Sequence, residues 1–223
     1  ELKKNKNIYF ISMQSNGTYF TKEKIDELEK AGLNRIHLSI HSTDPKQSKE
    51  LFGTDEYNVK KILEVIEHIS KSKIELMLAP VLLPGINDEE IEKLVELAKR
   101  IGCKIGIQKY EEYKYSRKPK GIKKENYYKF YKRLEELEEK YDIKLIYKHE
   151  AGEIYKGKSL EKPIKVGERI NAKILSDGWN DGQIIAAFKN RAITINDCEA
   201  EEGDKINLKV LENKSNIYLA KRV

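Results

Sequence analysis

The sequence predicts an α/β protein in which an incomplete (β/α) barrel is followed by a small all-β, OB-like barrel. Over residues 1–155, apolar runs of strand length alternate with stretches of helical period, and polar or turn residues follow the apolar runs. From residue 164 onward, the helical period gives way to short alternating strands separated by turns that contain Gly and Asp. Between them, residues 156–163 combine Gly, Lys, Ser and Pro and are predicted to be a linker.

The first region is predicted to hold four strand–helix units, then a further strand. Strands are expected at 8–13, 35–40, 73–81, 104–110 and 144–147, and helices at 21–32, 59–69, 91–102 and 125–141. In the last helix we expect Tyr127, Phe130 and Tyr131 to face the core, because their period continues that of the leucines after them. A closed barrel of this type has eight strands, and only about five are visible here, so we expect the barrel to be incomplete.

The second region is predicted to hold five strands, at 169–175, 183–188, 191–195, 205–211 and 216–220. Its turns are expected at 177–178, 181–182, 189–190 and 202–204, where Gly, Asn and Asp supply the backbone freedom that hairpins require.

Composition limits the classes of function. The chain has 223 residues, 43 Lys and Arg against 37 Asp and Glu, a net charge of +6 and a pI near 9.0. This balance allows an anionic partner, although a solvated Lys-rich surface is the commoner explanation. No long uninterrupted apolar run and no signal-peptide pattern occur, which predicts a cytoplasmic protein without membrane association. Because the sequence begins at Glu1 and enters a strand within a few residues, we expect the native protein to extend upstream.

The segment 83–88 (LPGIND) is the clearest strand-to-helix turn. It ends an apolar run, turns at Pro84-Gly85, and offers Asn87 or Asp88 as the cap of an acidic first helical turn. Similar loops follow the two preceding strands, at 15–18 and 41–45. Loops after the carboxyl ends of parallel strands are where such proteins place their ligands, so these three loops predict the position of the site.

Strand alternation sorts the side chains near this edge. On the second strand Ile36, Leu38 and Ile40 share the face that must pack on helices, which turns His37, Ser39 and His41 inward. The same reasoning places polar groups from several strands in the interior, and Met77 and Ala79 leave them room; these groups are Gln14, Ser39, His41, Gln108 and Tyr110. They can hydrogen-bond a polar ligand; alternatively, they satisfy one another or bind buried water.

No reactive pair or metal motif stands out in the sequence. No residues resemble a nucleophile with its base, and the two cysteines, Cys103 and Cys198, lie too far apart for any metal or redox spacing. The catalytic residues therefore stay unknown, and the polar groups of the interior are interpreted as positioning groups for a cofactor and a substrate.

The order and spacing of these motifs resemble the later half of a radical S-adenosylmethionine (SAM) enzyme. The resemblance rests on segments 15–18 (SNGT), 38–42 (LSIHS), 57–59 (YNV) and 80–88 (PVLLPGIND). Segments 107–110 (IQKY) and 117–119 (RKP) are similar to an archaeal iron–sulfur oxidoreductase branch of that superfamily. The region from 166–168 (VGE) to 203–206 (GDKI) is similar to a TRAM domain, a small RNA-binding barrel.

The resemblance implies SAM and a [4Fe-4S] cluster as cofactors. Members hold the cluster through a three-cysteine loop after the first barrel strand, receive an electron from a donor, and cleave SAM to a 5′-deoxyadenosyl radical. This sequence has neither that loop nor the glycine-rich segment that holds the amino group of SAM, and both would lie upstream of Glu1. The positions that match the SAM-contacting part are Asn16, Ser39, His41, Ala79, Pro80 and Val81. At the barrel mouth, Gln108, Lys109 and Tyr110 are expected near the substrate.

Two regions are candidates for RNA contact. Residues 99–133 contain thirteen Lys or Arg against three Glu, with Tyr110, Tyr113 and Tyr115 interleaved, and their candidate contacts are Lys118, Lys120 and Lys123. Alternatively, this region is a solvated loop whose tyrosines fold onto the barrel mouth.

From Pro163 onward the small barrel has ten basic and nine acidic residues, so its charge alone does not predict RNA binding. Its best candidate contacts are Lys173, Trp179, Lys189 and Arg191.

The leading hypothesis is a radical SAM enzyme that modifies RNA, with the TRAM-like barrel presenting the substrate. A second hypothesis keeps the chemistry but takes a small molecule or a protein as substrate, with the small barrel as a lid or docking domain. A third is a non-catalytic RNA-binding protein built on a barrel without a cluster.

Overall fold

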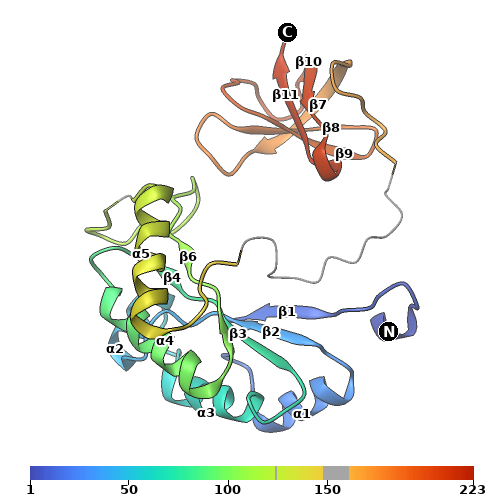
Figure 1. The fold of residues 1–223 in the computed structure, drawn as a ribbon. Helices are drawn as coiled ribbons and strands as arrows, with labels where there is room; N and C mark the ends of the chain where they lie inside the picture. Colours follow the sequence, from blue (N-terminus) through green and yellow to red (C-terminus); the bar gives the residue numbers. More distant parts are fainter. Residues whose placement is uncertain (124, 148–160) are drawn as a thin grey trace. The chain divides into compact units, whose positions relative to one another are not determined.

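The computed structural model describes residues 1–123, 125–147 and 161–223 (Figure 1). It divides into two compact units. The described residues of the first unit are 1–111, 118–123 and 125–147, and those of the second are 112–117 and 161–223. Of the predicted linker at 156–163, only residues 161–163 fall within the described residues.

The first unit alternates short parallel strands with helices. Its strands are β1 (Ser12–Ser15), β2 (Arg35–Leu38), β3 (Glu75–Leu78), β4 (Val81–Leu82), β5 (Lys104–Ile105) and β6 (Gln108–Lys109). Its helices are η1 (Leu2–Lys4), α1 (Lys22–Lys30), α2 (Pro45–Phe52), α3 (Val59–Ile69), α4 (Asp88–Ile101) and α5 (Tyr127–Tyr141). Strands β1, β2, β3 and β5 form a parallel sheet in that order, and β4 pairs with β6 in a second, two-stranded parallel sheet.

The sequence explains most of these boundaries. The side chains of Thr21, Asn58 and Asn126 cap α1, α3 and α5, because each accepts a hydrogen bond from the N–H three residues further on. Helix α2 was not expected, although Asp44 caps it in the same way and Pro45 occupies its first turn. The strand expected at 73–81 is divided into β3 and β4 at Pro80, which has no N–H to donate to a ladder.

Helices cover one face of the four-stranded sheet. Ile36, Leu38 and Ile40 point into the core that the sheet shares with α3 and α4, and all three are completely buried. The alternate residues His37 and Ser39 lie on the opposite face and stay partly exposed. In Figure 1, α1, α3 and α4 lie together on one side of the strands. The other face is therefore not covered by these helices.

Two expectations for the end of this unit are wrong. In α5, Phe130 is buried, but Tyr127 is 57% exposed and Tyr131 46% exposed, because the buried stripe continues from Phe130 to Leu134 and Leu137. Residues 144–147 do not form a strand. Instead, the N–H groups of this segment donate to the carboxylate of Glu138 on α5, which takes the place of a strand partner.

The second unit is a closed five-stranded barrel. Its elements are β7 (Arg169–Asp177), β8 (Ile184–Phe188), β9 (Arg191–Ile195), β10 (Lys205–Glu212), η2 (Lys214–Asn216) and β11 (Tyr218–Arg222). The strand order around the barrel is β10-β11-β9-β8-β7, and only the β9–β11 pair is parallel. Lys189 and Asn190 both have positive φ, which is the conformation of a tight two-residue hairpin between β8 and β9.

The predicted fold class, a partial parallel α/β barrel followed by a small closed β-barrel, is confirmed. Within the residues that the structure describes, every helix is too short or too polar to cross a lipid bilayer.

Candidate functional site

Small side chains form a row at the carboxyl ends of the strands. The ladder continues past the strand ends: the N–H of Ser39 donates to Ser15 O (2.8 Å), that of Ala79 to Leu38 O (2.9 Å) and that of Gly106 to Leu78 O (2.8 Å). Ser39, Ala79 and Gly106 are thus neighbours on three adjacent strands, on the face that helices do not cover. This row is called the small-residue shelf below; because its three side chains are small, it is the part of the sheet edge where a flat group would meet the least side-chain bulk.

Larger residues form the next row toward the amino ends. Gln14, His37 and Met77 are in register on β1, β2 and β3. The Cε atom of Met77 lies 2.4 Å from the position that a Cβ on Gly106 would occupy, so Met77 fills the space beside that glycine. Met77 therefore packs against Gly106 at the amino-terminal side of the small-residue shelf, and a side chain at position 106 would displace it.

The loop after β1 places Asn16 at the same edge. Ser15 Oγ accepts from the Gly17 N–H (3.0 Å) and Asn16 Oδ1 from the Thr18 N–H (3.1 Å), which fixes the loop by two local turns. Gly17 has φ 73°, and a Cβ there would lie 2.9 Å from Leu38 Cδ1. Glycine is thus needed both for the conformation and for the packing of the loop, while Asn16 stays exposed.

His41 is held as a neutral imidazole. Its Nδ1 accepts a hydrogen bond from the Val81 N–H (3.1 Å), and its ring stacks on Phe52 (centroids 4.7 Å apart), which stacks in turn on Tyr57 (3.9 Å). Burial lowers the pKa of His41 to about 4. Because Nδ1 accepts, the proton is on Nε2, which makes His41 a hydrogen-bond donor near neutral pH. The hydroxyl of the buried Tyr57 has no partner among the described residues, and burial raises its pKa.

Asn87 is the N-cap residue of α4, as expected, but its side chain ties two loops together instead of binding the first N–H groups of the helix. Its Oδ1 accepts from the Leu83 N–H (2.8 Å), and its Nδ2 donates to the carbonyls of His41 (2.9 Å) and Val81 (3.0 Å). Asp88 likewise binds back to the N–H of Gly85. Both side chains thus close the turn that precedes the helix, and the N-cap position of Asn87 is satisfied without a side-chain bond to the helix. Both backbone groups of Val81 already have a partner, so its side chain is the part most directly available to a ligand.

A buried carboxylate holds the loop after β2. Glu90 Oε2 accepts from the Ser42 hydroxyl (3.0 Å), from the N–H (2.5 Å) and hydroxyl (2.7 Å) of Thr43, and from the Asp44 N–H (3.1 Å); its Oε1 accepts from Lys93 Nζ (2.5 Å). Burial by itself raises the pKa of this carboxyl, but the hydrogen bonds outweigh it and lower the pKa to about 2. Nothing in the one-dimensional pattern distinguished Glu90 from its acidic neighbours.

An ion-paired cluster lies nearer the amino ends of the strands. Arg35 Nε and Nη2 donate to Glu75 Oε2 (2.9 and 2.7 Å), Lys104 binds Glu75 Oε1 (2.7 Å), and the guanidinium of Arg35 lies over the ring of Phe10. Strand alternation places Arg35 on the same face as His37, and it places Glu75 on that face too. The ion pair could therefore have been predicted by applying strand alternation to the amino ends of the strands. Its distance from the shelf along the strands indicates a structural role.

The three residues predicted on the substrate side differ in their surroundings. Gln108 is exposed, and Tyr110 is partly buried. Lys109 is largely enclosed: its Nζ donates to Glu111 (2.8 Å) and to the Tyr110 carbonyl (3.2 Å) and lies over the ring of Tyr127. Of the two adjacent polar side chains, Gln108 is therefore the one open to a ligand.

The described residues do not fit an iron–sulfur cluster. No group of three His, Cys, Asp or Glu side chains in residues 1–123, 125–147 and 161–223 is arranged to bind a metal. The two cysteines lie in different units; Cys198 is buried, and burial raises the pKa of Cys103 to about 11, which disfavours the thiolate that a metal requires.

The predicted RNA contacts fall in both units. Lys118, Lys120 and Lys123 are exposed on the loop before α5, in the first unit. The other four belong to the second unit: Lys173 is exposed on β7, whereas Lys189 pairs with Glu168 (3.1 Å) and Arg191 donates to the Asn190 carbonyl (3.1 Å).

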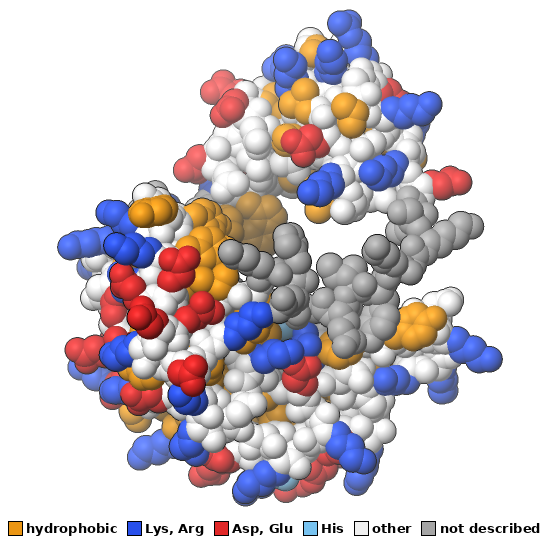
Figure 2. Space-filling view, in the orientation of Figure 1, with side chains coloured by type: hydrophobic (Ala, Val, Ile, Leu, Met, Phe, Trp, Pro, Cys, Tyr) orange, Lys and Arg blue, Asp and Glu red, His pale blue; other side chains and the backbone are white. Residues whose placement is uncertain are grey.

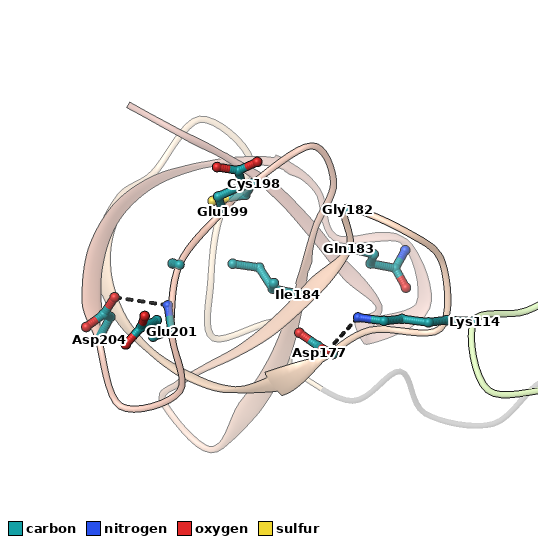
Figure 3. A pocket seen from close by; sticks show the side chains of 10 residues that line it. Lys114, Asp177, Gly182, Gln183, Ile184, Cys198, Glu199, Glu201 and Asp204 are labelled. Atoms are coloured by element: carbon teal, nitrogen blue, oxygen red, sulfur yellow. Dashed lines mark hydrogen bonds and ion pairs between the residues drawn. The ribbon is translucent and has the colours of Figure 1, made fainter.

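Trp179, the fourth of these, lies in an aromatic groove. It is 68% exposed, and its ring meets that of Tyr113 edge to face at 5.9 Å. The groove, about 340 Å³ in volume, is lined by Tyr113, Tyr115 and Trp179 together with Ser116, Asp177 and Gly178. Asp177 anchors the segment 112–117 to β7, since its Oδ2 accepts from Lys114 Nζ (2.6 Å) and the Tyr115 hydroxyl (2.8 Å); the ion pair is drawn in Figure 3.

Residues 1–98 match the model of the Radical SAM superfamily. The chain is 38% identical over 237 residues to the uncharacterized protein MJ0103 of Methanocaldococcus jannaschii, an alignment that covers 96% of this chain and 55% of that protein. It is 31% identical over 100 residues to the GTP 3′,8-cyclase of Aquifex aeolicus, covering 45% of this chain and 31% of the cyclase. The chain thus spans only about half, or less, of these relatives.

Among solved structures, Streptococcus suis SuiB aligns with a TM-score of 0.48 and 20% identity, over 58% of this chain and 29% of that one.

Proposed function

We propose that this chain supplies the later (β/α) units of a radical SAM enzyme that modifies RNA, and that its TRAM-like barrel presents the RNA. The match of residues 1–98 to the superfamily is the observation that carries the proposal. Membership of the archaeal iron–sulfur oxidoreductase branch belongs to the same proposal and rests on the segments 107–110 and 117–119.

The carboxyl edge of the first unit fits the adenosine part of SAM. The small-residue shelf gives a flat group room beside Ala79, and His41 and Asn16 add polar groups at the rim. Pro80 and Val81 would contact the group through their surfaces, because the Pro80 carbonyl accepts from the Gln108 N–H and both backbone groups of Val81 are engaged. When bound with its cluster, SAM supplies hydrogen abstraction; the described residues offer no cluster ligands, so their part is to bind and orient.

RNA is the favoured substrate because the second unit is a small closed barrel with exposed aromatic side chains. Unpaired bases stack on such side chains with about 1–3 kcal/mol each, and Trp179 and Tyr115 are exposed in one groove. The exposed lysines at 118, 120 and 123 add positive charge in the first unit. A small-molecule substrate is the second candidate, favoured by the similarity of about 100 residues to enzymes named GTP 3′,8-cyclases.

Binding of SAM to this chain tests the first half of the proposal. Saturation-transfer NMR with SAM should show transfer to its adenine protons. Ser39→Leu, which fills the shelf, should weaken binding by tenfold or more, equivalent to about 1.4 kcal/mol. Ser12→Leu is the matched control, because Ser12 lies exposed at the amino end of the neighbouring strand β1. Equal binding by the two variants would contradict the assignment of the shelf.

The substrate class requires an experiment in cells. Nucleoside mass spectrometry of RNA from the source organism with and without the gene should reveal a modified nucleoside that disappears with the gene and returns on complementation. An unchanged nucleoside profile, together with SAM binding by the protein, would favour the small-molecule candidate.

A further inference from the structure

Like charges face one another across the strands on the outside of the barrel. In the register of β7 and β10, Arg169 is opposite Lys209, and Lys173 is opposite Lys205. In that of β10 and β11, Lys209 is also opposite Lys221. All five side chains are exposed, and none forms an ion pair within the described part of the chain. Directly opposed like charges destabilise a sheet, so this arrangement is unfavourable for the barrel by itself.

These five residues, Arg169, Lys173, Lys205, Lys209 and Lys221, are called the basic face. Lys209 is its centre, because it has a cation opposite it on both neighbouring strands. Between the two cation pairs of β7 and β10, Asn171 Nδ2 donates to Asn207 Oδ1 (2.8 Å). At about 3.4 Å per residue, cations four positions apart are separated by roughly 14 Å along a strand. One phosphate group can engage one pair of cations, whereas a polyanion can engage both pairs.

Acidic residues are concentrated elsewhere in the barrel. Residues 177–204 have seven acidic and two basic side chains, whereas residues 163–176 and 205–223 together have two acidic and eight basic ones. The near-neutral total thus conceals two regions of opposite charge. Figure 2 shows Lys and Arg side chains gathered at the end of the second unit where Figure 1 labels β10 and β11.

The acidic region includes an open pocket of about 580 Å³. Its rim carries Asp177, Glu199, Glu201 and Asp204, as Figure 3 shows, and only Asp177 is paired with a cation of the lining, Lys114. A polyanion is repelled from this pocket and attracted to the basic face. The charge distribution therefore selects one side of the barrel for an anionic partner.

We propose that the basic face binds the phosphate backbone of single-stranded RNA. The ligand's identity rests on the proposed function, while its position rests on the strand register. Single-stranded RNA is favoured over an anionic lipid surface because β7, which carries Arg169 and Lys173, ends at the exposed aromatic groove of Tyr113 and Trp179. There a base can stack while the backbone follows the strands.

Fluorescence anisotropy of the whole 223-residue chain with a labelled 12-nucleotide single-stranded RNA tests this proposal. Lys209→Gln should weaken binding by about tenfold at low salt and lower the salt slope of the affinity by about 0.7, the value for one phosphate contact to a single strand. The double variant Lys205→Gln/Lys209→Gln should lower the slope by about 1.4. Lys214→Gln is the matched control, since it removes the same exposed charge from η2 and should change neither quantity.

Thermal unfolding separates this role from loss of structure. Removing Lys209 relieves the repulsion with Arg169 and Lys221, so the barrel of Lys209→Gln should melt at the same or a higher temperature while RNA affinity falls. Wild-type affinity and salt slope in the double variant would overturn the proposal. If the double variant binds normally but Lys118→Glu/Lys120→Glu does not, RNA binding stands and the basic face is wrong.

Two further outcomes also count against the proposal. Absence of RNA binding by the wild-type chain, with binding to vesicles that contain phosphatidylserine, would assign the basic face to a membrane. Displacement of RNA by inorganic phosphate at an equal phosphate concentration would indicate a site for one phosphate only. None of these measurements requires catalytic turnover. RNA binding by the basic face can therefore be refuted while SAM binding by the first unit is still observed, which keeps the two proposals distinguishable.

Discussion

Replacement of Glu90 by Gln should destabilise the first unit although the two side chains have nearly the same shape. In the wild type, four donors on Ser42, Thr43 and Asp44 converge on one carboxylate oxygen, and Lys93 binds the other. The pKa of Glu90 is about 2, against an ordinary value of 4.5. At about 1.36 kcal/mol for each pH unit, the folded structure favours the charged form by about 3 kcal/mol. We expect Glu90→Gln to lose about 2–3 kcal/mol at pH 7.

The dependence on pH gives a sharper test than the value at one pH. Since the folded pKa lies below the unfolded one, the stabilisation is fully present above about pH 4.5 and is lost as the pH falls toward 2. The difference in stability between wild type and Glu90→Gln should be constant from pH 7 to about 5.5. About two thirds of it should be gone at pH 3.

Urea unfolding followed by circular dichroism measures the difference, and amide hydrogen exchange at Thr43 and Asp44 locates it. Glu89→Gln is the control, because Glu89 is exposed one residue earlier in the same helical turn. A difference below about 0.5 kcal/mol at pH 7, within the range of ordinary surface substitutions, would refute the reasoning. So would a difference that persists unchanged to pH 3.

Two further predictions concern the loops of the same edge. His41 should show the Nε2–H tautomer by NMR above pH 5 and titrate near pH 4. Since its folded pKa lies below the usual 6.5, the stability of the first unit should fall as the pH drops from 6.5 toward 4. A titration midpoint of His41 above pH 6 would contradict this. Gly17→Ala should destabilise the first unit by about 1–3 kcal/mol, because φ is 73° and the new Cβ would lie 2.9 Å from Leu38 Cδ1; Gly85→Ala, also at positive φ but with open space around it, should cost less in the same denaturation assay.

Local patterns in the sequence predicted the fold well because burial follows the period of each element. Ile36, Leu38 and Ile40 alternate with polar residues, and buried residues alternate with exposed ones along β7. Each pattern repeats within a few residues, so it can be recognised without knowledge of the tertiary structure. The side-chain partners were harder to predict where one residue type suits two kinds of hydrogen bond. Asn87 has the residue type and position of a helix cap, and only the geometry of the loops shows that it binds Leu83, His41 and Val81.

The charge pattern of the small barrel could not be predicted for a different reason. Which cation faces which depends on the register between β7 and β10, whose paired residues Asn171 and Asn207 are 36 positions apart. Composition contains no information on strand pairing, so the ten basic and nine acidic residues gave a net charge near zero and no sign of a basic face. Among the predicted contacts, Lys173 lies on the basic face, whereas Lys189 is paired with Glu168.

The start of α4 organises the loop after β2 and the turn after β4 in the candidate site of the first unit. Asn87 fixes the loop carrying His41 and the strand carrying Val81, and Glu90, three residues later, fixes the loop from Ser42 to Asp44. Both side chains satisfy backbone groups that would otherwise need water or a ligand, so the edge is formed before any ligand arrives. A preorganised edge loses little conformational entropy on binding. Two residues that shape the site therefore lie beneath its loops, at the start of a helix that covers the opposite face of the sheet.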